Sequence, residues 1–318
     1  MRQNKDDHDK YDKMFELLKE TKKKKMKILH NWIIHTIVVI IALIPTSVLV
    51  EQRVFSQPES AYFFSSGSTD SGVYFISSTN GDGVGWVSKL AADGSVIDSR
   101  WATDLLHPMG MRVSGKRLWV NNIHEVVGIN LDDPSDRIIH PIDGAISLND
   151  LATDSSGYAY LSDSMNSRVV RVDLATGENS TYISTLPSSP NGLLVQGDRL
   201  YIASWGVMSD QPEERAEWIT KTAGDLYWVS LKNAKKSRHI IASELGNLDG
   251  VEIDRKGNFY VSDWESGKLY KISSETKMVI NLGQYGQGLA DIGLNLHTGE
   301  LALPVMLSSE ILFLTPNP

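Results

Sequence analysis

Two sixteen-residue stretches of this chain, one hundred residues apart, align without a gap. Residues 148–163 read LNDLATDSSGYAYLSD, and residues 248–263 read LDGVEIDRKGNFYVSD. Each has Asn or Asp at its second position, followed by an apolar strand, an Asp-x-x-Gly turn, a second strand and a closing Ser-Asp pair. A gapless repeat of paired strands predicts an architecture of repeated β units. It also puts Asn149 and Asp249 at equivalent positions, where they could converge on one ion.

Short landmarks like the start of these stretches recur at intervals of 40 to 58 residues. Strands rich in Val, Ile, Tyr and Leu follow them, for example at residues 72–76, 117–120 and 199–203. Four short strands fill such an interval, which is the size of a propeller blade. The sequence therefore predicts an all-β fold, a six-bladed β-propeller over residues 55–316. The six landmarks are Pro58-Glu59, Pro108-Met109-Gly110, Leu148-Asn149-Asp150, Pro190-Asn191-Gly192, Leu248-Asp249-Gly250 and Leu289-Ala290-Asp291.

The landmarks also predict where polar side chains gather. Because the innermost strand of a blade begins just after its landmark, the landmark side chains should share one face near the central axis. The polar ones are Glu59, Asn149, Asn191 and Asp249. The longest interval holds an insertion at about residues 205–223, between the second and third strands of the fourth blade. We expect it to overhang the same face as a lid, and a loop without ligand contact is the alternative. The last strand, near residues 311–314, is expected to pair with the first blade and close the ring.

The first fifty residues differ from the rest. Residues 29–50 contain no Asp, Glu, Lys or Arg, and as a helix rising about 1.5 Å per residue they would span about 33 Å, enough to cross a bilayer. Five lysines lie just before them. The pattern predicts a charged cytoplasmic segment over residues 1–28, a single transmembrane signal-anchor helix over 29–50, and an extracytoplasmic propeller, whether periplasmic, extracellular or lumenal. A cleaved signal peptide that yields a secreted protein, and a buried soluble helix, are the alternatives.

Composition excludes several kinds of site. The chain has no cysteine, which rules out disulfides, thiolate zinc sites and a cysteine nucleophile. Of 31 Lys and Arg and 39 Asp and Glu, ten and six fall in residues 1–30, so the remainder carries 21 basic against 33 acidic residues. This acidic body argues against nucleic acid as a partner. The sequence also has no Gly-x-Ser-x-Gly elbow and no His-Glu-x-x-His helix.

Four of the landmarks, in their order along the chain, resemble motifs of the SMP-30/gluconolactonase family of six-bladed propellers. This group includes paraoxonases and diisopropyl-fluorophosphatase. The motifs are Pro58-Glu59-Ser60, Leu148-Asn149-Asp150, Ser-Pro-Asn-Gly-Leu at 189–193 and Leu-Asp-Gly-Val at 248–251. The resemblance implies a divalent ion at the top of the central channel, usually Ca²⁺ although another divalent cation is possible. By motif its ligands would be Glu59, Asn149, Asn191 and Asp249, with Asp249 also the catalytic general base or nucleophile.

This ligand set is chemically reasonable, because two carboxylates and two amide oxygens form a hard, all-oxygen site suited to calcium. The resemblance implies a membrane-anchored, calcium-dependent hydrolase whose substrate is a small-molecule lactone or related ester. A bound cation polarises such a carbonyl, and a carboxylate beside it can accept a proton. The alternative is a non-catalytic propeller that binds a ligand or a protein, with a structural metal or none. Asn and Asp beside Gly are also ordinary turn residues.

The chain departs from the family pattern at two positions. Met109 stands where paraoxonases carry a histidine, which argues against a histidine-assisted mechanism; His107 and His124 lie near without fitting the motif. Ser147 stands where sugar-lactone hydrolases often carry an arginine, so a sugar-acid substrate is not supported. Four further side chains are expected either to line the pocket or to serve packing and loop capping: Asp163, Asp263, Trp205 and Trp264.

Overall fold

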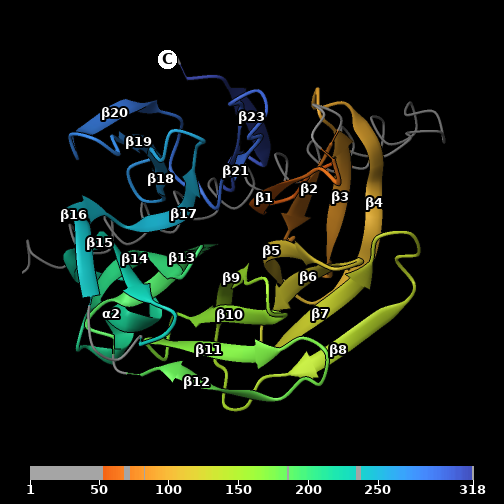
Figure 1. The fold of residues 1–318 in the computed structure, drawn as a ribbon, viewed down its shortest axis with the longest axis horizontal. Coiled ribbons are helices and arrows are strands. Elements are labelled where there is room, and N and C mark those ends of the chain that lie inside the picture. The colour runs from red at the N-terminus through yellow and green to blue at the C-terminus, as the bar shows by residue number, and fades with distance from the viewer. Residues whose placement is uncertain (1–52, 68–71, 82, 185, 234–237, 317–318) are drawn as a thin grey trace, which may run out of the picture. The chain divides into compact units, whose positions relative to one another are not determined.

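The described part of the chain folds into six antiparallel sheets arranged around a central axis (Figure 1). The structure, a computed structural model, describes residues 53–67, 72–81, 83–184, 186–233 and 238–316. Within these ranges, no helix has the length and hydropathy needed to cross a membrane. The predicted segments 1–28 and 29–50 lie outside the described residues.

Each sheet is one blade, and its strands follow one another in sequence from the axis outwards. Blade one contains β1 (Pro58–Phe64), β2 (Val73–Ser78), β3 (Gly85–Ala91) and β4 (Val96–Leu105). Blade two contains β5 (Pro108–Ser114), β6 (Arg117–Asn122), β7 (Glu125–Asn130) and β8 (Arg137–Pro141). Blade three contains β9 (Leu148–Thr153), β10 (Tyr158–Asp163), β11 (Arg168–Asp173) and β12 (Asn179–Ile183).

The second half of the ring continues this order. Blade four contains β13 (Ser189–Gln196), β14 (Arg199–Met208), β15 (Thr220–Ser230) and β16 (Arg238–Gly246), with the short helix α2 (Pro212–Ala216) between β14 and β15. Blade five contains β17 (Leu248–Ile253), β18 (Phe259–Asp263), β19 (Lys268–Ile272) and β20 (Val279–Gln284). Blade six contains β21 (Gly293–Leu294), β22 (Leu301–Val305) and β23 (Glu310–Leu314). The predicted six-bladed, all-β propeller is therefore confirmed.

The Asp-x-x-Gly turns of the repeat are built by their own side chains. In blade three, Asp154 Oδ1 accepts the backbone N–H groups of Ser156 at 2.8 Å and Tyr158 at 3.1 Å. Gly157 adopts a φ of 89°, which a residue without Cβ reaches at little cost. Blade five repeats this turn with Asp254 and Gly257. In blades three and five, the local sequence thus fixes where the first two strands are joined.

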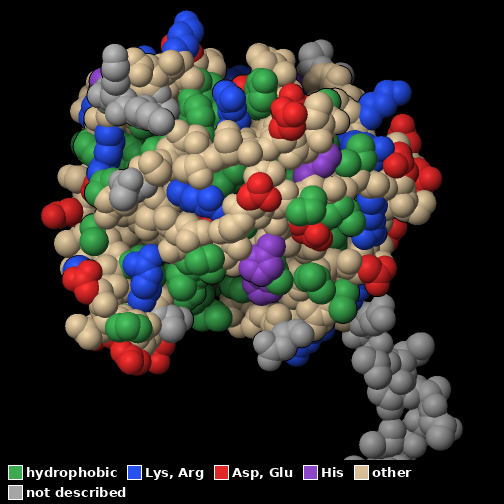
Figure 2. Space-filling view, turned by 90° about the horizontal axis from the view of Figure 1, so that it is seen from below, with side chains coloured by type: hydrophobic (Ala, Val, Ile, Leu, Met, Phe, Trp, Pro, Cys, Tyr) green, Lys and Arg blue, Asp and Glu red, His purple; other side chains and the backbone are tan. Residues whose placement is uncertain are grey.

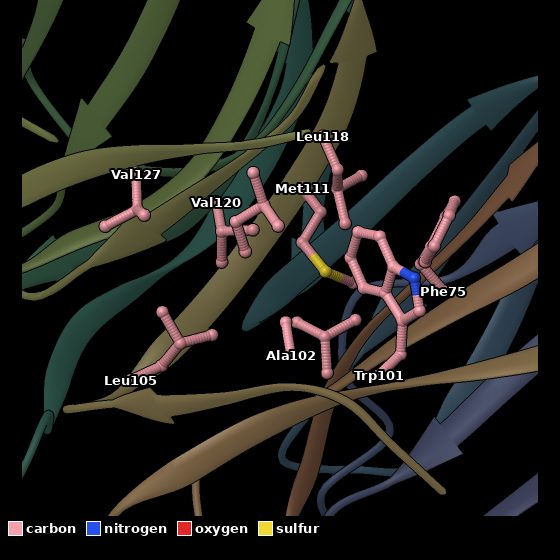
Figure 3. Close-up of a cluster of buried hydrophobic side chains, with 10 residues drawn as sticks. Phe75, Trp101, Ala102, Leu105, Met111, Leu118, Val120 and Val127 are labelled. Atoms are coloured by element: carbon pink, nitrogen blue, oxygen red, sulfur yellow. The ribbon is translucent and has the colours of Figure 1, made fainter. Parts of the chain in front are cut away.

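Six apolar clusters fill the spaces between neighbouring blades. Figure 3 shows the cluster between blades one and two, where Phe75 and Trp101 face Met111 and Leu118. Fully burying one such side chain contributes about 1.5–3 kcal/mol. The core is therefore distributed around the ring, and each blade depends on both neighbours.

Ring closure differs from the prediction. The last strand, β23, pairs with β22 in a three-stranded blade six and does not join blade one, whose sheet is completed by β4. The first and last blades meet through backbone contacts at the axis, where the N–H of Asp291 donates to the carbonyl of Glu59 at 2.9 Å. Outside the axis they meet through side chains, with the Tyr74 and Phe313 rings 5.4 Å apart. The apolar pattern of residues 311–314 fits either partner, so the sequence could not choose between them.

The surface shown in Figure 2 carries Lys and Arg side chains interspersed with Asp and Glu. Mixed charge of this kind favours solubility and creates no large field of a single sign on this face.

Candidate metal centre and active site

A cavity of about 620 Å³ lies where the inner strands begin. All four residues predicted as metal ligands line it, each from a different blade. They are the second or third residues of their strands: Glu59 in β1, Asn149 in β9, Asn191 in β13 and Asp249 in β17. Each is buried, with between 2 and 8% of its surface exposed. The structure thus brings together residues spread over most of the ring.

A break in strand pairing frees each of these side chains from the sheet. In blade five, Leu248 pairs with Asp263 and Val251 with Val261, so Asp249 and Gly250 have no partner on β18. Corresponding register shifts occur at the start of the inner strand in blades one, two, three and four. A bulge of this kind re-aims side chains. Here it turns the landmark residues toward the axis.

Serines on the second strands hold these bulges in place. Ser262 Oγ accepts the N–H of Gly250 at 2.8 Å, and Ser162 Oγ accepts the N–H of Asp150 at 2.8 Å. In blade one, Ser77 Oγ accepts the N–H of Ser60 at 2.9 Å. Since a buried N–H without a partner costs about 1–3 kcal/mol, each serine removes a penalty that the bulge would otherwise carry. This explains the serine that closes both halves of the sequence repeat.

The aspartates that follow these serines serve the adjacent loops. Asp163 Oδ1 accepts the N–H of Ser147 at 3.2 Å, and its Oδ2 accepts from Arg168 Nε at 2.8 Å. Asp263 Oδ1 accepts the N–H of Asn247 at 3.1 Å. Neither aspartate lines the cavity. Of the two roles expected from the sequence, the structure assigns them loop capping.

Close packing at the axis orients the amide group of Asn191. A Cβ at Gly192 would overlap the carbonyl oxygen of Asp249, so only glycine fits after Asn191. Asn191 Nδ2 donates to the carbonyl of Leu248 at 3.1 Å. This bond fixes the amide with its Oδ1 on the other side, available to a ligand.

One buried oxygen on each of the four side chains has no hydrogen-bond partner among the described residues. These atoms are Glu59 Oε2, Asn149 Oδ1, Asn191 Oδ1 and Asp249 Oδ1. A buried polar atom is ordinarily satisfied, and four orphaned oxygens around one cavity fit a hard cation. No cluster of three or more His, Cys, Asp or Glu suited to a metal occurs in the described part of the chain. The four candidate ligands are not a cluster of that kind, because only two of them are carboxylates and the other two are amides.

The carboxylates of the site repel one another. Burial raises the pKa of Glu59 well above its usual value, and the charges of Asp249, Asp291 and Asp150 raise it further. Burial likewise raises the pKa of Asp249 well above normal, with a contribution from Asp150. Such shifts measure how unfavourable the charged forms are in the absence of a counter-ion. A divalent cation would supply that counter-ion.

One arginine offsets part of this negative charge. Arg112 on β5 is buried, and its guanidinium nitrogens lie 3.6 Å from Glu252, 3.8 Å from Asp291 and 4.0 Å from Asp150. Together with Glu59 and Asp249, five buried or largely buried carboxylates therefore surround the axis, against this single arginine. Arg112 lies beside Asp150, Glu252 and Asp291. The two remaining carboxylates, Glu59 and Asp249, are the ones that line the cavity.

Several lining residues were not identified from the sequence as site members. His107 lines the cavity, and burial lowers its pKa so that the imidazole is neutral at neutral pH. Its only sequence signal is its place two residues before Met109. Met109 and Ser147 also line the cavity, at the positions where the family pattern is broken, whereas His124 does not.

The insertion in blade four forms part of the cavity wall. It lies between the second and third strands of that blade, as predicted, and Trp205, Trp218 and Thr220 from this region line the cavity. Much of it continues the strands, because Gly206 pairs with Ala223 and neighbouring residues extend the ladder. Only the part around α2 departs from the sheet. The insertion therefore contacts the site, as a lid would, but mostly as extended strand.

Comparison with known proteins identifies the fold. No sequence family matches the chain, and no curated protein sequence matches it. Among solved structures, a chain of a nidogen/laminin complex is 12% identical with a TM-score of 0.55, covering 73% of this chain and 91% of its own. A streptogramin B lyase is 10% identical with a TM-score of 0.53, covering 83% of this chain and 95% of its own. Likeness at this identity establishes the propeller, and the activity has to be argued from the site.

Proposed function

We propose that this protein is a calcium-dependent hydrolase of lactones or related esters, of the SMP-30/gluconolactonase type, with its metal at the top of the propeller channel. One observation carries the proposal: four buried side-chain oxygens without hydrogen-bond partners line a single cavity. The ligand motifs in the sequence support it independently. A streptogramin B lyase with the same fold is an enzyme by name, which is consistent with catalysis on this scaffold.

The residues divide the chemistry between them. Glu59, Asn149, Asn191 and Asp249 would hold the ion, and the ion when bound would polarise an ester carbonyl and lower the pKa of a water molecule. Asp249 is the proposed base, because its carboxylate lines the cavity and can accept a proton from an attacking water. The bulge held by Ser262 Oγ fixes the backbone next to Asp249, and therefore the direction of its side chain. Trp205 and Trp264 would supply an apolar part of the cavity wall.

The test is a screen of lactones and aryl esters with the full chain purified in a mild detergent, with calcium and after chelation. We expect calcium-dependent hydrolysis that falls at least 100-fold in Asp249→Asn, because the substitution removes the base and one anionic ligand. Glu59→Gln should weaken calcium binding, since it removes the other anionic ligand.

Asp173→Asn is the matched control, because Asp173 serves a hairpin at the far end of β11, where its Oδ1 accepts the N–H of Ala175. It should keep both activity and calcium affinity. Full hydrolysis after chelation, or in Asp249→Asn, would contradict the mechanism.

A second candidate is a propeller that binds a protein partner and uses any metal only for stability. The similar chain in a nidogen/laminin complex supports this possibility, because that structure is named for a protein assembly. Calcium binding without turnover of any ester, together with stabilisation of the fold, would favour this alternative.

We further propose that residues 29–50 anchor the protein in a membrane with the propeller on the extracytoplasmic side. The uncharged stretch and the five lysines before it support this topology. Membranes from expressing cells should retain the chain through alkaline carbonate washing, and protease added to the propeller side should degrade it. Release of the propeller into the soluble fraction with a new N-terminus after residue 50 would instead favour a cleaved signal peptide.

A further inference from the structure

Three tryptophans meet in the wall of the cavity that also holds the proposed metal ligands. Trp205 lies between the other two, with ring centroids 5.9 Å from Trp218 and 5.8 Å from Trp264. The interplanar angles are 71° and 56°, so the rings form a corner and not a stack. All three line the cavity. The three ring planes are therefore inclined to one another in the wall of the cavity.

The backbone is strained to place one of these rings. Trp218 has a φ of 60°, a left-handed conformation that is rare for a bulky residue. Two hydrogen bonds hold it: Trp205 Nε1 donates to the Trp218 carbonyl at 2.9 Å, and the Trp218 N–H donates to the carbonyl of Arg215 at 3.1 Å. This conformation ends α2, where the N–H of Ile219 donates to the carbonyl of Glu214 at 2.9 Å, and Trp218 lines the cavity from this position.

The charged side chains that line the cavity are all acidic. Glu217 and Glu265 are exposed, while Glu59 and Asp249 belong to the proposed metal centre. No Lys or Arg is among the lining residues in the described part of the chain. The nearest arginine in sequence, Arg215, does not line the cavity, and its guanidinium donates to the carbonyl of Met165 at 2.7 Å.

We propose that the tryptophan corner, formed by Trp205, Trp218 and Trp264, binds the cationic end of the ligand, an alkylammonium or quaternary ammonium group. Aromatic faces attract such cations, and the exposed carboxylates of Glu217 and Glu265 add a favourable field. An anionic ligand would be repelled by the same carboxylates. The corner and the metal centre share one cavity, so a single ligand can occupy both.

This site narrows the substrate class of the proposed enzyme. Resting on the proposed function, we infer that the preferred ester or lactone carries its carbonyl toward the metal centre and a cationic group toward the tryptophan corner. No covalent step at the corner is implied. Its role is to position the substrate and to select its charge.

The test compares three small probes of matched shape by isothermal titration calorimetry on the full chain in detergent, at low ionic strength. Choline carries a trimethylammonium group, 3,3-dimethylbutan-1-ol replaces the nitrogen with carbon, and 3,3-dimethylbutanoate is the anion. We expect choline to bind at least tenfold more tightly than the neutral alcohol, and the anion to bind more weakly than either. Equal affinities for choline and the alcohol would show an apolar pocket only. That result, or no choline binding, overturns the proposal.

Two pairs of variants locate the binding. Trp218→Leu should weaken choline binding at least tenfold, whereas Trp228→Leu should not, because Trp228 stacks on His239 outside the cavity. Glu217→Gln should lower the preference for choline over the alcohol about threefold, whereas Glu213→Gln, on the exposed surface of α2, should leave it unchanged. The glutamate pair keeps the test decisive even if Trp218→Leu fails to fold. Unchanged choline binding in Glu217→Gln and Trp218→Leu contradicts the proposed location.

The outcome can be separated from that of the proposed hydrolase. Choline binding is measured with a chelator present and requires no turnover. Selective choline binding without calcium-dependent hydrolysis would leave the corner established and reject the enzyme. Hydrolysis of neutral esters without a preference for choline would support the enzyme and reject the binding of cations at the tryptophan corner.

Discussion

At the scale of single residues, buried acidic side chains and one buried arginine lie together at the centre of the ring. Arg112 lies within 4.0 Å of three carboxylates, yet five carboxylates share the axis. Burial raises the pKa of Glu252 to about 7, opposed by Arg112 and assisted by Asp150. The protonation of this residue should therefore influence stability near neutral pH.

The folded state of the metal-free protein should lose stability as the pH rises. Glu252 has a pKa of about 7 in the fold against 4.5 as its ordinary value. Its contribution to the free energy of unfolding is thus complete below about pH 4.5 and is lost as the pH rises through about 7. Glu252→Gln should flatten the decline in denaturant midpoint between pH 5 and 8, whereas Glu275→Gln, on an exposed hairpin, should follow the wild type. Parallel pH profiles for wild type and Glu252→Gln would contradict this assignment.

At the scale of the structural element, the functional unit is a bulged inner strand together with the serine of its neighbour. The bulge directs a side chain to the axis, and the serine accepts the N–H group that the bulge leaves unpaired. The same pairing of parts recurs in blades one and three. The geometry of the site is therefore maintained by residues that never touch a ligand.

Replacing one of these serines with alanine should lower both stability and calcium affinity, although only a hydroxyl group is removed. Ser262→Ala leaves the N–H of Gly250 and the carbonyl of Ala290 without their bonds, which should cost roughly 1–3 kcal/mol of stability. Calcium affinity should fall as well, because Asp249 is no longer held. Ser274→Ala, in the exposed hairpin of the same blade, is the control and should change neither quantity measurably. Calorimetry of unfolding and of calcium binding measures both effects, and an unchanged calcium affinity in Ser262→Ala would argue against this holding role.

The sequence predicted the repeated features of the blades but not the features that occur in one blade only. The polar landmarks gave the number of blades and the side chains around the cavity, because a repeat exposes equivalent positions directly. Trp218 and His107 were not identified as cavity residues from the sequence, because neither belongs to the repeated landmarks. The predicted pairing of β23 with the first blade was wrong, because the apolar pattern of a strand does not specify which strand it pairs with. The arginine at 112 could not be placed, since its three carboxylates come from other blades.

At the scale of the whole molecule, the proposed ligands come from blades one, three, four and five. An ion held by all four would tie blade one, which is adjacent to blades two and six, directly to blades three, four and five. Among the described residues, the cluster between blades six and one contains five buried apolar residues, against eight to ten in the other clusters. A central link would support the ring as a whole, this junction included.

Calcium should therefore raise the thermal stability of the entire propeller. At a calcium concentration about 100 times its dissociation constant, linkage predicts about 2.7 kcal/mol of added stability. For a domain of this size, that corresponds to a rise in Tm of roughly 5–10 °C. Differential scanning calorimetry should show one shifted transition for the wild type and a smaller shift for Asp249→Asn. A Tm that is independent of calcium would reject the proposed link.

The order of the strands also bears on how such a protein can diversify. Every blade is encoded by one unbroken stretch of chain, with no strand lent to a neighbour. A tandem duplication of such a stretch copies a complete blade, including its bulge and its axial position. The copy can then drift from amide to carboxylate at that one position while its frame is kept, as between Asn149 and Asp249. New combinations of axial groups are accessible by single substitutions, without redesign of the scaffold around them.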